Sequence, residues 1–177
     1  PVLMQLGEVA GFAAATAKEQ NGSPGQLTVD TLQHSLVEHG FALTFFNDVE
    51  VGDGGRRSVA MQYLGTKGFF PNYDARPDDP LTKGIAELWA NGYSSLLRDD
   101  HDSNSLARRI YESPTATGVQ IKRTEFIEMF EVDAKSVGTN LDSPLVPVSD
   151  RVIDRGEAIE LIYELVLKES QKRSKVT

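Results

Sequence analysis

The sequence contains no cysteine, and this absence removes several kinds of chemistry at once. Without thiols, the chain of 177 residues forms no disulfide, offers no thiolate ligand to a metal and has no cysteine nucleophile. Long hydrophobic runs are also absent, since every apolar stretch is much shorter than the roughly 20 residues of a membrane-spanning helix. Residues 1–15 lack the basic start of a secretion signal. The sequence therefore predicts no membrane span and no targeting segment within this chain, and both cytoplasm and cell envelope stay open as locations.

Positive charge is scarce as well. Lysine and arginine number 18 against 26 aspartate and glutamate residues, which gives a formal net charge of −8 and a pI near 4.9. A nucleic-acid partner needs clustered cations to neutralise its phosphates, so this balance argues against nucleic-acid binding. The hydrophobic content of 40% is enough to bury an ordinary core, and the length suits one domain or two small ones.

Small and apolar residues fill the first part of the chain. Residues 2–18 are predicted to form a helix in which Gly7, Gly11 and Ala14 are three to four residues apart and therefore share one face. Each interior glycine costs a helix about 1 kcal/mol relative to alanine, so this face indicates that something approaches the backbone closely. Packing on another helix or on a sheet is the simpler interpretation of the same spacing.

A second helix is predicted after a turn. The turn-forming residues 21–25 end the first helix. The second begins after the expected N-cap Thr28 and ends at Gly40, which suits the residue that follows a helix. Its apolar stripe consists of Leu32, Leu36 and Val37.

These two helices resemble a known family. The string "VLMQLGEVAGFAAATAKEQNGSPGQLTVDTLQHSLVEHGFAL", residues 2–43, is similar to the C-terminal end of FAD-dependent oxidoreductases. In that family a Met-x-x-Gly-x-Ala-Ala-Gly-x-Ala-Ala-Ala helix precedes an Asp-Val-x-x-Leu-Gln helix. Met4, Gly7 and Gly11 match the first pattern, whereas Val9 replaces an alanine and Thr28 replaces the aspartate.

The resemblance implies a role for the first helix. In such enzymes this helix closes the flavin-binding domain with its positive N-terminal end toward the flavin. Gln5, Leu6 and Gly7 would then lie nearest the FAD of the intact parent protein, and the partner would be the upstream flavin-binding domain. No Gly-x-Gly-x-x-Gly fingerprint follows a strand-like run in this chain, so we expect a fragment that holds no FAD and no catalytic residue of its own.

The rest of the chain carries a pattern three times. An apolar residue, a polar residue and a lysine or arginine precede a helix in "LTKGIAELW" from Leu81, "IKRTEFIEMF" from Ile121 and "IDRGEAIELIYELV" from Ile153. Helices over residues 58–67 and 105–112 are expected to partner the first two, and residues 133–139 are a weaker candidate for the third. We therefore predict an all-α chain with two parts, a helix pair over residues 1–45 and a lobe of about three helix hairpins over residues 46–177.

The lobe resembles a second family. The string "AMQYLGTKGFFPNYDARPDDPLTKG", residues 60–84, is similar to an S-layer homology repeat of bacterial envelope proteins, and the helix starts at Ile121 and Ile153 are similar to those of further repeats. In that family a Thr-Arg pair at the helix start belongs to a carbohydrate-binding signature. Its counterparts here are Thr82 with Lys83, Lys122 with Arg123, and Asp154 with Arg155.

This second resemblance implies an alternative function, attachment to a cell-wall glycan. The binding residues would be Thr82, Lys83, Arg123 and Arg155, assisted by the partial positive charge of three helix N-termini. Surface ion pairs with nearby carboxylates are the competing interpretation of the basic residues. For the lobe as a whole, packing or oligomerisation, including a homo-oligomer, is the main expectation.

Other polar and aromatic residues favour structural roles. The carboxylates Asp74, Asp78 and Asp79 have no complete calcium-loop spacing, so turn formation before Pro80 is the preferred interpretation. The three histidines are too scattered for a metal site and are expected at the surface; they are His34, His39 and His101. Five large aromatic residues are expected in the core, with sugar stacking as the alternative: Trp89, Tyr93, Phe126, Phe130 and Tyr163.

Overall fold

The computed structural model describes residues 2–19, 21–50, 55–113, 118–136 and 150–174. Within these ranges the chain is helical, with isolated β-bridges and no strand, which confirms the all-α prediction. A 3₁₀ turn, Pro24–Gln26, joins the first two helices. The α-helices are α1 Val2–Glu19, α2 Val29–Glu38, α3 Arg56–Thr66, α4 Lys83–Leu97, α5 Ser103–Glu112, α6 Arg123–Ser136 and α7 Arg155–Ser174.

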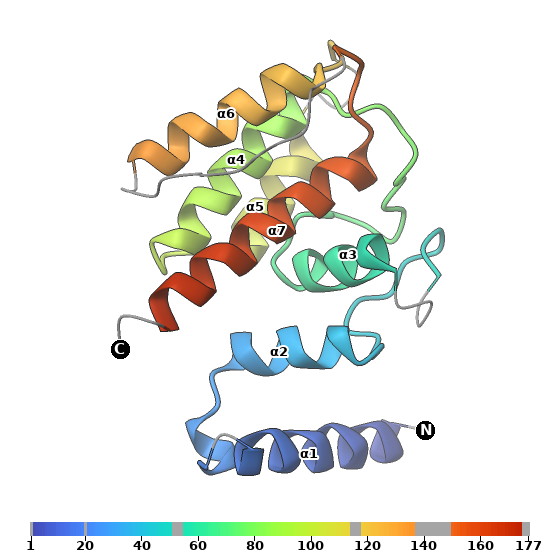
Figure 1. Ribbon diagram of the computed structural model, residues 1–177. Helices are drawn as coiled ribbons and strands as arrows, with labels where there is room; N and C mark the ends of the chain where they lie inside the picture. The colour runs from blue at the N-terminus through green and yellow to red at the C-terminus, as the bar shows by residue number, and fades with distance from the viewer. Residues whose placement is uncertain (1, 20, 51–54, 114–117, 137–149, 175–177) are drawn as a thin grey trace.

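The helices form a lobe with a helix pair beneath it (Figure 1). Helices α4, α6 and α7 begin close together at one end of the lobe and run side by side, and α3 packs along α7. Helix α5 packs on α4. Helix α2 contacts α3, and α1 lies on the far side of α2, away from the starts of α4, α6 and α7.

The large aromatic residues fill the core of the lobe as predicted. Trp89, Tyr93, Phe126 and Phe130 are at most 2% exposed, and Tyr163 is 6% exposed. The indole Nε1 of Trp89 donates to the carbonyl of Phe69 over 3.0 Å, so its buried polar atom has a partner. These residues are therefore core residues and offer no stacking surface to a sugar.

Several predicted helix ends agree with the structure and one is wrong. The Thr28 hydroxyl accepts from the Thr31 N–H over 3.1 Å, and Gly40 has φ of 80°, as expected for an N-cap and for the residue after a helix. Helix α5 begins at Ser103, two residues before its predicted start, because the carboxylate of its N-cap Asp102 accepts two backbone N–H groups. Residues 133–136 continue α6, and 137–139 lie outside the described residues.

A closed ring of backbone hydrogen bonds joins the starts of α4, α6 and α7. The N–H of Leu81 donates to the carbonyl of Ile153 (2.9 Å), that of Ile153 to Ile121 (3.2 Å), and that of Ile121 to Leu81 (2.9 Å). All three side chains are fully buried. Buried backbone groups need partners, and this ring provides them without a sheet.

The helix pair is attached to the lobe by polar contacts. The Asp30 carboxylate of α2 accepts from the Tyr63 hydroxyl of α3 and from Nζ of Lys67, the residue that follows α3, each over 2.6 Å. Burial opposes its charge, but these two hydrogen bonds keep the pKa of Asp30 below its usual value. His34 stacks on Tyr163 of α7 with ring centroids 5.5 Å apart. The contact between α2 and the lobe therefore combines directional hydrogen bonds with the burial of Val37, which is 2% exposed in the core.

The chain between the pair and the lobe is also packed. The backbone N–H groups of Leu43 and Thr44 donate to Gln62 Oε1 over 2.9 and 2.8 Å, and Phe46 is 5% exposed in the core. The boundary predicted near residue 46 thus falls in a segment fixed to the lobe. The division into two domains stays a prediction.

The contact of Asp30 can be tested by its pH dependence. Asp30→Asn should lower the free energy of unfolding by about 0.5–1 kcal/mol at pH 7, because a half-exposed carboxylate loses two charge-assisted hydrogen bonds. A lowered pKa means that the contribution is complete above the ordinary carboxyl value of 3.8 and is lost as pH falls through the folded-state value. Urea unfolding at about pH 7, 5 and 3 should show the difference at the first two and a smaller one at the third. Glu112→Gln, at an exposed carboxylate of α5, is the control, and equal stability of Asp30→Asn and wild type at pH 7 would contradict the assignment.

Candidate functional site

The basic residues predicted at the helix starts occupy equivalent places in the structure. Two residues after each member of the backbone ring, a second set of bonds repeats the same pattern: Lys83 N–H to Val119, Arg123 N–H to Arg151, and Arg155 N–H to Asp79, at 2.8, 2.9 and 3.0 Å. We call residues 81–83, 121–123 and 153–155 the three helix heads. The structure brings Thr82, Lys83, Arg123 and Arg155 to this end of the lobe, but their side chains have different surroundings.

Arg155 is held inside the protein. Its guanidinium lies 5.2 Å from the ring centroid of Trp89 and 5.9 Å from that of Phe70, and its Nε donates to the carbonyl of Ala75 over 2.9 Å. Burial lowers the pKa of Arg155 to about 10, so the group is still a cation at neutral pH. Cation–π contacts and a backbone acceptor stabilise it there. Arg155 therefore links α7 to the loop before α4.

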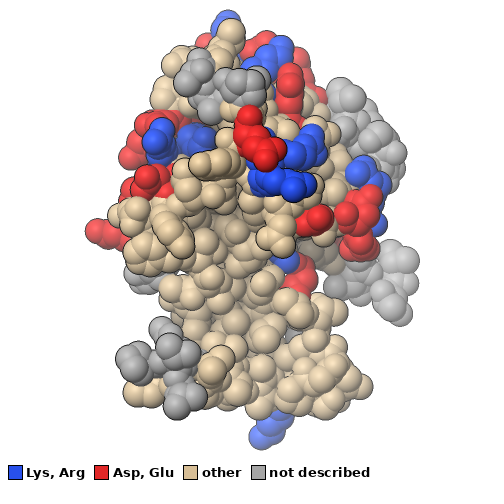
Figure 2. Space-filling view, turned by 180° about the vertical axis from the view of Figure 1, so that it is seen from behind, with Lys and Arg blue, Asp and Glu red and all other residues tan. Residues whose placement is uncertain are grey.

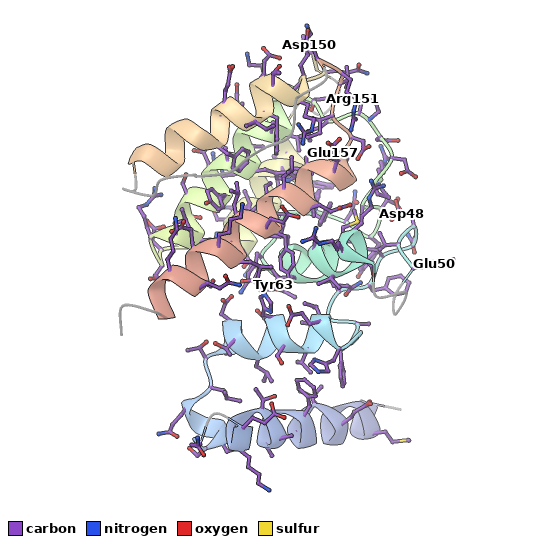
Figure 3. The ribbon with its side chains drawn as sticks, viewed as in Figure 1. Asp48, Glu50, Tyr63, Asp150, Arg151 and Glu157 are labelled. Carbon is purple, nitrogen blue, oxygen red and sulfur yellow. The ribbon has the colours of Figure 1, made fainter. Side chains whose placement is uncertain are left out.

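Arg123 forms an ion pair with the next helix. Its Nε donates to Glu157 Oε1 over 2.6 Å, and Arg151 donates through NH2 to Glu157 Oε2 over the same distance. The side chains of Arg123 and Glu157 are 14% and 19% exposed, so much of this pair is out of water. Figure 3 shows Arg151 and Glu157 together at the start of α7, with Asp150 beside them. One carboxylate thus neutralises two arginines.

Lys83 differs because it is exposed and lines a groove. The groove between α4 and α6 has a volume of about 510 Å³. Its floor includes Ala90 and Ile121, and no ion pair of Lys83 occurs among the described residues. The polar residues that line it besides Lys83 are Glu87, Asn91, Glu125 and Glu128. Of the three basic residues, Lys83 is the one whose charge faces an open groove.

The residue four places after each ring member explains these differences. On α7 this residue is Glu157, which pairs with Arg123, and on α6 it is Glu125, which lines the groove with Lys83. On α4 the same place is taken by Ile85, which is 2% exposed. Because Ile85 offers no carboxylate at this place, Arg155 contacts aromatic rings and a carbonyl instead of forming an ion pair like that of Arg123. The shared glutamate in "IKRTE" and "IDRGE" was the sequence signal for this pairing, and the sequence reasoning did not use it.

The Thr82 hydroxyl is buried and does not face solvent. Thr82 occupies the N-cap position of α4, but its side chain makes no capping bond, and its hydroxyl is buried without a hydrogen-bond partner among the described residues. An unsatisfied buried hydroxyl costs about 1–3 kcal/mol. The corresponding Lys122 instead points outward and donates to Asp150 over 2.6 Å, which raises the pKa of Lys122 and lowers that of Asp150.

The residues expected near the flavin lie on α1. Leu6 is 61% exposed, and a Cβ built on Gly7 or on Gly11 would meet nothing within 4 Å. Gln5 is in the helix, and its side chain lies outside the described ones. The close approach that these glycines suggest therefore has no partner within the described part of the chain.

The remaining candidates have structural partners. Asp74 accepts from Asn47 Nδ2 over 2.8 Å and Asp78 from Arg57 over 3.1 Å. The turn expected before Pro80 is closed by the Asp79 N–H, which donates to the carbonyl of Arg76 over 3.2 Å. The expectation of a surface histidine is wrong for His101, which contacts Ser95 Oγ and the carbonyl of Lys67, each over 2.7 Å. Its two partners lie 6 and 34 residues away, too far apart for a local sequence pattern to reveal.

The described residues contain no group of three histidine, aspartate or glutamate side chains that could hold a metal ion. Among the same residues, no helix combines the length and the apolar character needed to cross a bilayer. Comparisons with protein-family models, curated proteins and solved structures gave no match.

Arg155 provides a test of the helix-head geometry. Arg155→Met retains a long, flexible hydrocarbon chain but removes the cation and its hydrogen bond to the Ala75 carbonyl. We expect the free energy of unfolding to fall by about 1–3 kcal/mol. Trp89 is the only tryptophan, so its fluorescence should change in position or intensity in the folded state. Lys83→Met, at the exposed equivalent position, is the matched control and should change neither quantity. Unchanged stability and emission in Arg155→Met would show that the buried contact is not formed.

Proposed function

We propose that this chain is the non-catalytic C-terminal part of an FAD-dependent oxidoreductase and that α1 packs against the flavin-binding domain of the same protein. The observation that supports the proposal is the uncovered face of α1. Met4 is 79% exposed on the face of Gly7 and Gly11, which border open space, and Leu6, on another side of the same end of the helix, is 61% exposed. An exposed face of apolar and small residues suits close contact with another protein surface.

The opposite face of α1 is already occupied. Phe12 packs against His39 and Phe41, with ring centroids 4.8 and 5.4 Å apart, and Ala17 is 1% exposed. Few charged side chains appear on the part of the molecule formed by α1 and α2 in the view from behind (Figure 2). The exposed charged residues of α1 are Glu8, Lys18 and Glu19, so this helix carries few charges that a second surface would have to match.

The N-terminal turns of α1 suit a flavin. Backbone N–H groups at a helix start lack intrahelical partners, and the helix dipole adds partial positive charge there. The pyrimidine carbonyls of a flavin are electron-rich acceptors that such N–H groups can meet. With Gly7 in the second turn, no side chain blocks that approach. The unpaired N–H groups are those of the first four residues of α1, up to Gln5, and Leu6 and Gly7 follow in the next turn, so we place these three residues nearest FAD in the parent.

Substitution of the open glycine separates contact from folding. In the intact parent protein, Gly7→Leu should lower bound flavin, measured by absorbance near 450 nm per protein, by about tenfold, because the new side chain occupies the contact. In the isolated chain the same change should leave the melting temperature equal or higher, since leucine favours a helix by up to about 1 kcal/mol over glycine. Gly25→Leu is the control, because Gly25 also borders open space but lies outside α1. Undiminished flavin in Gly7→Leu, or no dinucleotide-binding fold upstream in the gene, would contradict the proposal.

The groove between α4 and α6 supports a second candidate, attachment to a cell-wall glycan. Lys83 lies there at the N-terminal end of α4, where an acidic sugar would meet a cation and a helix N-terminus. Arg123 and Arg155 already have partners inside the protein, which limits this role to Lys83. The three acidic residues of the groove oppose an acidic ligand.

Retention on purified cell-wall material tests this second candidate. Lys83→Ala should reduce retention by at least fivefold if the groove binds an acidic glycan, because the lysine that lines the groove is lost. Arg108→Ala removes an exposed cation from α5 and serves as the control. Equal retention of wild type and Lys83→Ala would reject glycan attachment through the groove. A dimer in sedimentation equilibrium would instead favour oligomerisation.

A further inference from the structure

Two exposed aromatic rings from distant parts of the chain touch each other. Phe45 is 67% exposed and Tyr73 is 65% exposed, and their ring centroids are 5.7 Å apart with an interplanar angle of 76°. We call these two residues the aromatic corner. It shares no residue with α1 or with the groove between α4 and α6.

The segment that carries Phe45 is fixed on both sides. Before it, the N–H groups of Leu43 and Thr44 donate to Gln62 Oε1. After it, Phe46 is buried and meets Phe70 edge to face, with centroids 5.2 Å apart. The two adjacent rings therefore differ: Phe46 enters the core, whereas Phe45 stays outside.

The segment that carries Tyr73 is fixed in the same way. The N–H of Asn47 donates to the carbonyl of Tyr73 over 2.8 Å. The Asp48 carboxylate accepts from the N–H groups of Ala75 and Arg76 over 3.0 and 2.7 Å, and Ala75 is fully buried. Both rings are therefore held outward by bonds in their own segments, although neither is needed to fill the core.

Polar groups border the rings. Asn47 Nδ2 donates to Asp74 Oδ1 over 2.8 Å, and Asn72 Oδ1 accepts from the Asp74 N–H over 3.1 Å. Each of these side chains carries one more polar group besides those in the two bonds. These groups are the carbonyl oxygen of the Asn47 amide, the NH₂ group of the Asn72 amide and the second carboxylate oxygen of Asp74. All three residues are exposed. The corner thus offers two aromatic rings, amide donors and carboxylate acceptors on one fixed surface.

We propose that the aromatic corner binds a neutral sugar unit. The C–H face of a pyranose is weakly positive and packs on the negative face of an aromatic ring, while its hydroxyls pair with amides and carboxylates at the edge. Asp48 and Glu50 lie near the start of α3 (Figure 3), and with Asp74 they outnumber Arg76, the one cation of residues 43–50 and 71–76, so the net negative charge disfavours acidic or phosphorylated sugars. The site does not depend on the proposed flavin partner.

Titration with defined oligosaccharides tests the proposal. The probes are cellotetraose, maltotetraose and tri-N-acetylchitotriose as neutral sugars, tetragalacturonate as the acidic counterpart, and tetralysine as a cationic peptide. Amide chemical shifts of the full chain should move around residues 43–48 and 71–76 with at least one neutral sugar, at millimolar or tighter affinity. Phe45→Ala and Tyr73→Ala should each weaken binding at least tenfold.

Controls separate binding from folding. Both rings are largely exposed, so neither variant should change the melting temperature by more than a few degrees. Tyr111→Ala removes another exposed tyrosine, on α5, and should leave sugar binding unchanged. The proposal is overturned if no neutral sugar moves these amides, if binding survives in Phe45→Ala and Tyr73→Ala, if tetragalacturonate or tetralysine binds the corner more tightly, or if the variants only abolish self-association.

Discussion

The lobe depends on the closed ring of three backbone hydrogen bonds among Leu81, Ile121 and Ile153. Each N–H and each carbonyl in the ring is used once, so three buried extended segments satisfy one another without a sheet. Because the ring fixes where α4, α6 and α7 begin, it also fixes which faces of these helices meet. Ala86, Phe126 and Ala158 follow five residues after the ring members and are all buried. One helix head cannot move without breaking bonds to both others.

The equivalence of the helix heads could be predicted from the sequence, but the contacts of their side chains could not. An apolar residue followed by a basic one before a helix is a local pattern, visible at all three places. What each base contacts depends on the neighbouring unit. Glu157 accepts from Arg123, whereas Ile85 offers Arg155 no charge, and Arg155 meets Trp89 instead. The three repeated units differ in the residue that meets each basic side chain. The same motif therefore gives an ion pair at Arg123, a cation–π contact at Arg155 and an exposed side chain in a groove at Lys83.

The positions of helices were predicted better than the structure of the connecting segments, because helix signals are local in the sequence and the contacts of the connecting segments are not. Periodicity and capping residues located α2 and most of α3, because these signals lie within one turn of the residues that they describe. The outward turn of Phe45 and the anchoring of His101 follow instead from Gln62 and Lys67, which are many residues away in sequence. A hydrophobic pair in a polar segment gives no sign of which ring will be buried.

Helix α1 lies outside the lobe and reaches it through α2. Helix α1 packs on α2 and on the 3₁₀ turn after it, while α2 in turn rests on the lobe through Asp30, Tyr63 and Lys67. A helix held on one face through a single neighbour has low local stability, because few contacts must break for it to separate. Burial of Met4, Leu6 and the glycine face against a second surface would add to that stability in proportion to the apolar area covered. Binding of a partner to the ordered form of α1 would therefore be coupled to the ordering of this helix.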